Sequence, residues 1–76
     1  MKVRVNNYYY FYPVPMDRFN PCYGLEQGLL KEGDRVKVVN KFGCPKANTM
    51  NHCYIEKDGQ FLGMVCCNSL TKRVQP

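Results

Sequence analysis

LKEGDRVKVV (residues 30–39), CYIEKDGQFLGMV (residues 53–65) and NSLTKRV (residues 68–74) are the segments that decide the fold. In the first segment, Val36 and Val38 alternate with charged residues, which predicts a strand with one buried face. In the second, Asp58 and Gly59 form the dipeptide that most readily adopts the two positive φ angles of a type I′ hairpin turn. Together these patterns predict an all-β fold of about five short strands.

The connections around these strands are also predicted from local residues. Residues 40–51 contain Gly43, Pro45 and three asparagines, which predicts a loop of about ten residues, long enough to bind a partner. Residues 68–70 (Asn-Ser-Leu) are typical of a single 3₁₀ turn, and residues 71–74 of a closing strand.

The N-terminal part of the chain is less regular. Residues 1–5 alternate between apolar and charged side chains, which predicts a half-buried strand, and the aromatic run at residues 8–12 predicts an edge strand that the following prolines end. Residues 17–30 contain several chain breakers and predict a loop with at most one helical turn. We therefore expect a single domain, with an N-terminal strand and loop segment (residues 1–29) and a barrel core (residues 30–76).

The order of these elements resembles that of a known fold family. Gly-Asp-Arg-Val-Lys-Val, a long loop, a hairpin, a brief Asn-Ser-Leu turn and a last strand resemble the SH3-like small barrels, including those of the KOW type found in ribosomal and transcription proteins. The resemblance covers about residues 30–74. It implies a small SH3-like barrel, to which the irregular, aromatic-rich N-terminal segment is added.

Size and charge restrict the possible functions. A chain of 76 residues with 45% hydrophobic residues forms one small globular domain, with little room for a deep active site. A net charge of +5 favours salt-sensitive association with phosphate backbones or acidic partner surfaces. The apolar runs are far shorter than the roughly 20 residues of a membrane-spanning helix, so we expect no membrane partner.

The five cysteines are Cys22, Cys44, Cys53, Cys66 and Cys67. Their odd number and the lack of a signal-peptide pattern at the N-terminus predict a cytoplasmic protein, in which the cysteines are mostly thiols. A zinc site would draw on Cys44, His52, Cys53 and Cys66. Because these residues lack the Cys-x₂₋₄-Cys spacing of structural zinc sites, they are weak metal candidates, and we expect no cofactor.

Neighbouring reactive side chains do not form a catalytic pair in the sequence. His52 and Cys53 are adjacent, and on extended backbone adjacent side chains point to opposite faces. The imidazole therefore cannot activate the thiol, and the same argument separates Cys66 from Cys67. We expect a protein that is not an enzyme, with Cys53 or Cys66 in the core and His52 at the surface.

The aromatic run at residues 8–12 is the main candidate for a binding surface. On a strand, Tyr8, Tyr10 and Tyr12 share one face, while Tyr9 and Phe11 share the other. One set should therefore be exposed, where it can stack on bases or bind a peptide. The alternatives are that both sets are covered within the domain, or that the exposed set mediates self-association.

Two classes of function follow. The first is a non-enzymatic protein-interaction module, a small accessory or inhibitor-type subunit that docks on the acidic surface of a larger assembly. Its expected partner-binding residues are Tyr8, Tyr10, Tyr12, Arg35, Lys37, Phe42 and Lys46.

The alternative is a nucleic-acid-binding small barrel, in which cations contact phosphates while aromatic rings stack on bases. The cations would be Lys2, Arg4, Arg35, Lys37, Lys41 and Lys46, and the rings Tyr8, Tyr10 and Phe42. A zinc-binding or redox-sensitive protein is a minor alternative.

Overall fold

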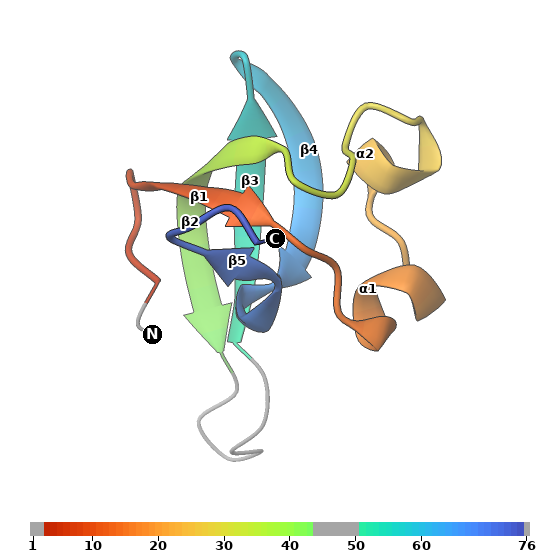
Figure 1. Ribbon diagram of the computed structural model, residues 1–76, viewed down its shortest axis with the longest axis horizontal. Helices are drawn as coiled ribbons and strands as arrows, with labels where there is room; N and C mark the ends of the chain where they lie inside the picture. Colours follow the sequence, from red (N-terminus) through yellow and green to blue (C-terminus); the bar gives the residue numbers. More distant parts are fainter. Residues whose placement is uncertain (1–2, 44–50, 76) are drawn as a thin grey trace.

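A single antiparallel sheet dominates the computed structural model, which describes residues 3–43 and 51–75 (Figure 1). Within these residues its strands follow the order β4-β3-β2-β1-β5. The strands are β1 (Tyr8–Phe11), β2 (Arg35–Gly43), β3 (Asn51–Lys57), β4 (Gln60–Cys66) and β5 (Leu70–Thr71), and the 3₁₀ turn η1 (Cys67–Ser69) precedes β5. The predicted all-β fold is confirmed. The sheet is open between its edges β4 and β5, so a closed barrel is not confirmed.

The hairpin between β3 and β4 forms as predicted. Asp58 has a φ of 53° and Gly59 a φ of 79°, the two positive angles of a type I′ turn. Lys57 and Gln60 close the ladder on either side of the turn. The predicted 3₁₀ turn is also present, one residue earlier than expected, and the closing strand is limited to Leu70–Thr71.

Strand β2 is longer than the sequence predicted. Residues 40–43 were expected to be loop, but they continue β2 and pair with β3 after a register shift between Val38 and Asn40. This shift keeps the ladder intact although the side-chain alternation changes at that point. The remainder of the predicted loop, residues 44–50, lies outside the described residues.

One hydrophobic core joins the N-terminal segment to the rest of the sheet. Alternate residues of the strands point into it, as the sequence pattern predicts. Its buried members are Val3, Tyr9, Phe11, Leu30, Val36, Val38, Cys53, Ile55, Leu62, Val65 and Leu70. Because Tyr9 and Phe11 face inward, the opposite face of β1 is turned toward solvent, and Tyr8 is 51% exposed.

The start of the chain differs from the prediction. Residues 3–5 are not a strand, because the chain turns at Asn6, whose φ is 71°. The Asn6 N–H then donates to the Val38 carbonyl at 2.7 Å, which fixes the entry into β1. Strand β1 is also not an edge strand, since it pairs with β2 on one side and β5 on the other.

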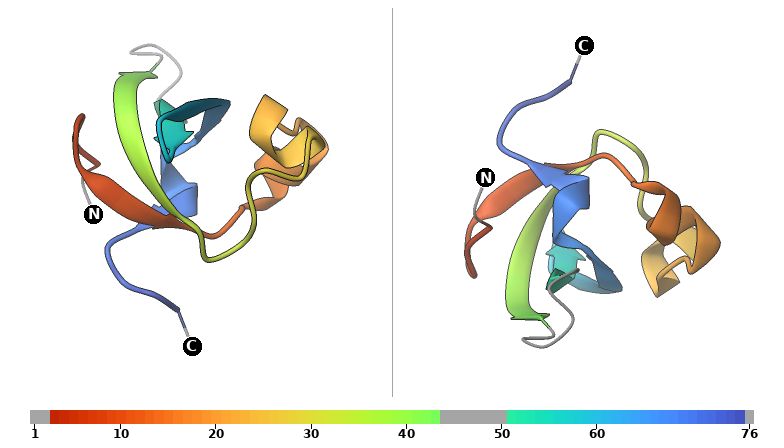
Figure 2. Two further views of the ribbon diagram at one scale, coloured as in Figure 1. Left: turned by 90° about the horizontal axis from the view of Figure 1, so that it is seen from above. Right: turned by 90° about the horizontal axis from the view of Figure 1, so that it is seen from below.

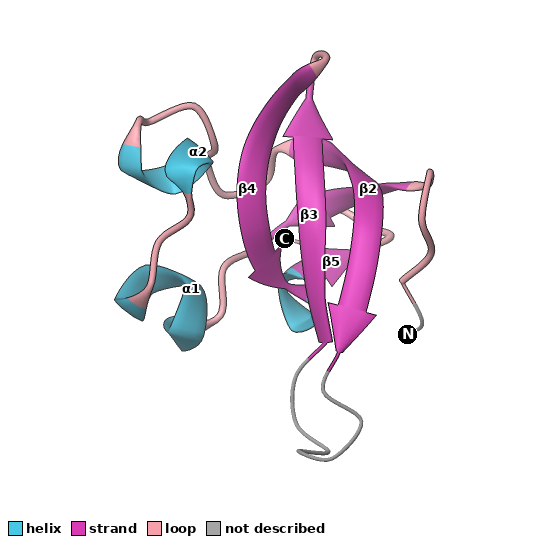
Figure 3. Ribbon diagram, turned by 180° about the vertical axis from the view of Figure 1, so that it is seen from behind, coloured by secondary structure: helices cyan, strands magenta, loops and turns pink. Residues whose placement is uncertain are grey.

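Two short helices replace most of the predicted loop: α1 (Pro15–Phe19) and α2 (Tyr23–Glu26). Pro15 is the first residue of α1, a position where its fixed φ suits a helix and its missing N–H costs nothing. Both helices lie on the β4 side of the sheet (Figures 2 and 3). Neither is long and apolar enough to cross a membrane, and no other helix among the described residues is.

Gly63 lets α2 approach β4 closely. A Cβ atom on Gly63 would lie 3.0 Å from the Cys22 Cβ and 3.2 Å from the Tyr23 nitrogen, and Gly63 has a φ of +107°. We expect Gly63→Ala to lower the free energy of unfolding by about 2 kcal/mol, because it adds crowding to backbone strain. Gly28→Ala is the matched control, since Gly28 has a φ of +73° but nothing within 4 Å of an added Cβ; it should cost about 1 kcal/mol. Equal losses in urea titrations would show that the close approach is unimportant.

Candidate functional site: an aromatic face and its pocket

The outer face of β2, β3 and β4 carries three rows of side chains that the ladder places side by side. From the end near η1 toward the hairpin, the rows are Phe42–His52–Cys66, Asn40–Tyr54–Met64 and Lys37–Glu56–Phe61. Strand β1 extends the third row, because Tyr8 pairs with Lys37. Paired residues of an antiparallel sheet lie on the same face, so the rows form one continuous surface.

Four ring side chains of this surface contact one another and are called the aromatic row. Its members are Phe42, His52, Tyr54 and Phe61. The ring of Phe42 lies 5.8 Å from that of His52 and 5.1 Å from that of Tyr54, and Tyr54 lies 5.7 Å from Phe61. Phe42 is 42% exposed and Phe61 52%. These rings pack against one another yet still present apolar area to solvent, which is typical of an interaction surface.

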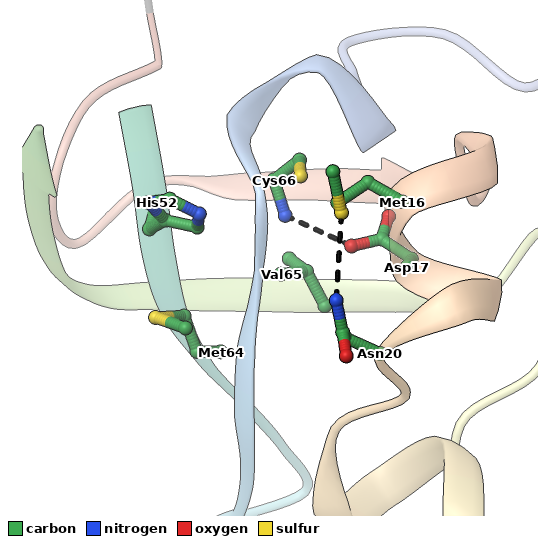
Figure 4. Close-up of a pocket in the computed structure, with 7 residues that line it drawn as sticks. All are labelled: Met16, Asp17, Asn20, His52, Met64, Val65 and Cys66. Atoms are coloured by element: carbon green, nitrogen blue, oxygen red, sulfur yellow. Dashed lines mark hydrogen bonds between the residues drawn. The ribbon is translucent and has the colours of Figure 1, made fainter. Parts of the chain in front are cut away.

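A pocket of about 310 Å³ adjoins the aromatic row, between α1 and the ends of β3 and β4 (Figure 4). It is lined by Met16, Asp17, Asn20, His52, Met64, Val65 and Cys66. His52 belongs to both the aromatic row and the pocket, and Met64 pairs with Tyr54. The row and the pocket therefore form one site, with room for a single large side chain of a ligand.

Asp17 attaches α1 to the sheet and so builds one wall of the pocket. Its carboxylate is buried and accepts hydrogen bonds from the Cys66 N–H at 3.0 Å and from the Ser69 hydroxyl. The Val14 N–H, at the start of α1, donates to the same carboxylate at 3.4 Å. A single side chain thus links α1, the end of β4 and η1.

Cys53 and Cys67 form a disulfide, with Cα atoms 5.7 Å apart. The expectation of reduced thiols is therefore wrong for this pair. The bond joins the buried face of β3 to η1, which sequence spacing does not reveal, because the two residues become neighbours only when η1 folds back on the sheet. Disulfides persist in oxidising compartments.

Cys66 remains a thiol but is poorly suited to be a nucleophile. Burial raises its pKa, and the negative charge of Asp17 and a hydrogen bond to that carboxylate raise it further. A raised pKa keeps the sulfur protonated at neutral pH, whereas the thiolate is the reactive form. The nearby imidazole of His52 lines the same pocket, but the surroundings of the thiol oppose its ionisation.

The raised pKa of Cys66 predicts a loss of stability in alkali. In the unfolded chain the thiol ionises near its ordinary pKa of about 8.5, whereas in the folded protein it stays protonated to higher pH. The free energy of unfolding should thus be unaffected by this group below about pH 8 and should fall as the pH rises further. Urea titrations from pH 7 to 10 should show a steeper fall for the native chain than for Cys66→Ala. Parallel pH profiles would contradict the assignment.

The weak metal candidates are dispersed by the fold. Cys53 belongs to the disulfide, His52 faces outward, and Cys66 faces Asp17. Cys44 lies outside the described residues. Among the residues that the structure describes, no group of three His, Cys, Asp or Glu side chains is arranged to hold a metal ion.

Four of the predicted partner-binding residues come together on one face. Tyr8 pairs with Lys37, and Tyr10 pairs with Arg35. The guanidinium carbon of Arg35 lies 4.4 Å from the centre of the Tyr8 ring, which is a cation–π contact. We call Tyr8, Arg35 and Lys37 the cationic corner, and it borders the Phe61 end of the aromatic row through the Lys37–Glu56–Phe61 row.

The other predicted residues are placed differently. The Tyr12 hydroxyl accepts a hydrogen bond from the Gln75 N–H at 2.7 Å, and Phe42 lies at the opposite end of β2 from the cationic corner. The Lys41 ammonium donates to the Val3 carbonyl at 2.9 Å, which links its side chain to the N-terminal segment. Arg4 is exposed. Lys46 and Lys2 lie outside the described residues.

The sequence reasoning missed the part that Tyr54, Phe61, Met64 and Asp17 play in the site. The outward position of Tyr54 could have been found, because it alternates with the buried residues of β3. The positions of Phe61 and Met64 could not, because β4 changes register against β3 between Ile55 and Glu56. For Asp17 there was a signal in the sequence: Pro15, two residues earlier, indicates the start of a helix.

Comparisons with protein-family models, with curated proteins and with solved structures find no match to this chain.

Proposed function

We propose that this protein is a non-enzymatic protein-interaction module, a small accessory subunit that docks on a larger protein partner through the aromatic row and the adjoining pocket. The observation that carries the proposal is the exposed run of contacting rings that continues, at His52, into the lining of a pocket. Aromatic residues, methionine and arginine are enriched in protein interfaces, and a pocket beside exposed rings is where binding energy concentrates.

We further propose that the architecture is that of a small SH3-like barrel. Three features support it: the strand order β4-β3-β2-β1-β5, a long β2 that pairs with both β1 and β3, and a 3₁₀ turn directly before the last strand. In this arrangement the chain between β1 and β2, with α1 and α2, lies beside β4, and α1 forms one wall of the pocket.

A protein partner fits this face better than a nucleic acid does. The rows Phe42–His52–Cys66 and Asn40–Tyr54–Met64 contain no arginine or lysine, and Glu56 stands between Lys37 and Phe61 in the third row. A phosphate chain that crossed the rings would pass this carboxylate, although nucleic-acid sites combine stacking rings with a positively charged groove. The cations of the described outer face are instead concentrated at the cationic corner.

Capture of a partner by the immobilised protein tests this function. Native lysate is passed over the protein with and without nuclease, and bound proteins are identified. Phe61→Ala should weaken capture by at least about tenfold, because truncation of an interface anchor commonly costs more than 1.4 kcal/mol. Tyr23→Ala is the control, since Tyr23 is equally exposed but lies on α2. Equal capture by Phe61→Ala and Tyr23→Ala, or loss of all bound material after nuclease, would refute the proposal.

A further inference from the structure

The cationic corner offers an oriented cation to a partner. The Arg35 side chain is exposed and its guanidinium lies over the Tyr8 ring, which holds the planar group in place. A guanidinium held in this way can still donate two parallel hydrogen bonds from its edge to a carboxylate. The arrangement therefore suits a single acidic side chain better than a diffuse negative surface.

The acidic residues of this region have other neighbours. Asp34, which precedes Arg35, accepts from the Lys57 ammonium and from the Lys31 N–H, each at 2.8 Å. Glu56 stands opposite Lys37 in the ladder, so these two opposite charges are neighbours on the outer face. Arg35 has a tyrosine, Tyr10, opposite it, and its charge is therefore the one that a carboxylate of the partner would complement.

The spacing between this cation and the pocket sets the length of the ligand. The guanidinium lies over Tyr8 on β1, in the row of Lys37, and the near side of the pocket is His52 on β3, in the row of Cys66. From Tyr8 to His52 is a diagonal of two strand spacings, from β1 to β3, and four residues along β3, roughly 16 Å. An extended peptide covers this distance in about five residues.

We propose that the partner presents a bipartite extended segment, in which a large apolar side chain enters the pocket and a carboxylate about five residues away binds Arg35. This inference rests on the proposed docking function and specifies the chemistry of its ligand. The ring of Tyr54, in the middle row of β3, lies between the two anchor points and packs against the intervening residues. The positive corner and the pocket, whose carboxylate Asp17 is buried and hydrogen-bonded to the Cys66 N–H, complement a ligand that is acidic at one end only.

Synthetic peptides of twelve residues provide the test. Each carries one phenylalanine and one glutamate in a Gly-Ser background, separated by two, five or eight residues, and binding to the full chain is followed by NMR chemical shifts. We expect the five-residue separation to bind most tightly, with shifts at both His52 and Tyr8. Exchange of its glutamate for glutamine should weaken binding about tenfold, because a charge-assisted bidentate contact is lost.

Variants of the protein separate this inference from the docking function itself. In Arg35→Gln the glutamate and glutamine peptides should bind equally, and Arg35→Lys should restore only part of the difference. Peptides that shift His52 regardless of the glutamate would overturn the bipartite ligand but leave the docking function intact. The bipartite ligand would also be overturned if no peptide shifted His52. The same conclusion would follow if the nucleic-acid probe oligo(dT) alone produced shifts at the aromatic row.

Discussion

Reduction of the Cys53–Cys67 disulfide is expected to lower the free energy of unfolding by about 3 kcal/mol. The bond closes a loop with a sequence separation of 14, and a loop of that size restricts the unfolded chain by roughly this amount. A domain of this length has a total stability on the order of 4–11 kcal/mol. Loss of the bond thus removes a large part of the total stability.

Urea titrations in the presence and absence of a phosphine reductant measure this effect. The midpoint of the native chain should fall in the reductant, while the double variant Cys53→Ala, Cys67→Ala should show a low midpoint in both conditions. The double variant controls for any effect of the reductant on other cysteines, because Cys22 and Cys66 are present in both proteins. A native midpoint that does not respond to reductant would show that the bond contributes little to stability.

The features that sequence predicted well are those that depend on neighbouring residues. Val36 and Val38 alternate with charged residues, and Asp58-Gly59 favours one type of turn, so β2 and the β3–β4 hairpin could be predicted without knowledge of the rest of the chain. The division of the aromatic run into a buried and an exposed set followed from the same alternation.

The features that it missed depend on contacts between distant residues. The helix α1 has only five residues, too few to be stable by itself, and it is held by a carboxylate that bonds to positions 49 and 52 residues later. The disulfide pairing could not be deduced from five cysteines. The same holds for the pocket, whose two walls come from α1 and from the ends of β3 and β4.

One part of the candidate site could be predicted from the sequence, and another part could not. Tyr8, Tyr10, Arg35 and Lys37 were predicted to bind a partner, and the pairing of β1 with β2 brings them together. The aromatic row could not be assembled from sequence, because the two register shifts decide which residues of β2 and β4 stand beside Tyr54. A shift of one residue would have turned each of these side chains to the other face.

Asp17→Ala is expected to lower the free energy of unfolding by about 3 kcal/mol and to weaken partner binding. The substitution leaves the Cys66 N–H and the Ser69 hydroxyl without their acceptor, and each buried donor left unsatisfied costs about 1–3 kcal/mol. The Val14 N–H also loses its bond at the start of α1. Because α1 carries Met16, one wall of the pocket should loosen even where the sheet remains folded.

The thiol of Cys66 reports on this loosening independently of stability. Asp17 helps to raise the pKa of that thiol, and α1 helps to bury it, so Asp17→Ala should make Cys66 react faster with a thiol reagent at pH 8, under conditions where the protein is folded. Glu32→Ala is the matched control, because Glu32 is an exposed carboxylate whose removal should change stability by less than about 0.5 kcal/mol. If the two variants matched in urea midpoint and in labelling rate, the hydrogen bonds of Asp17 would contribute little to stability or to the position of α1 at the wall of the pocket.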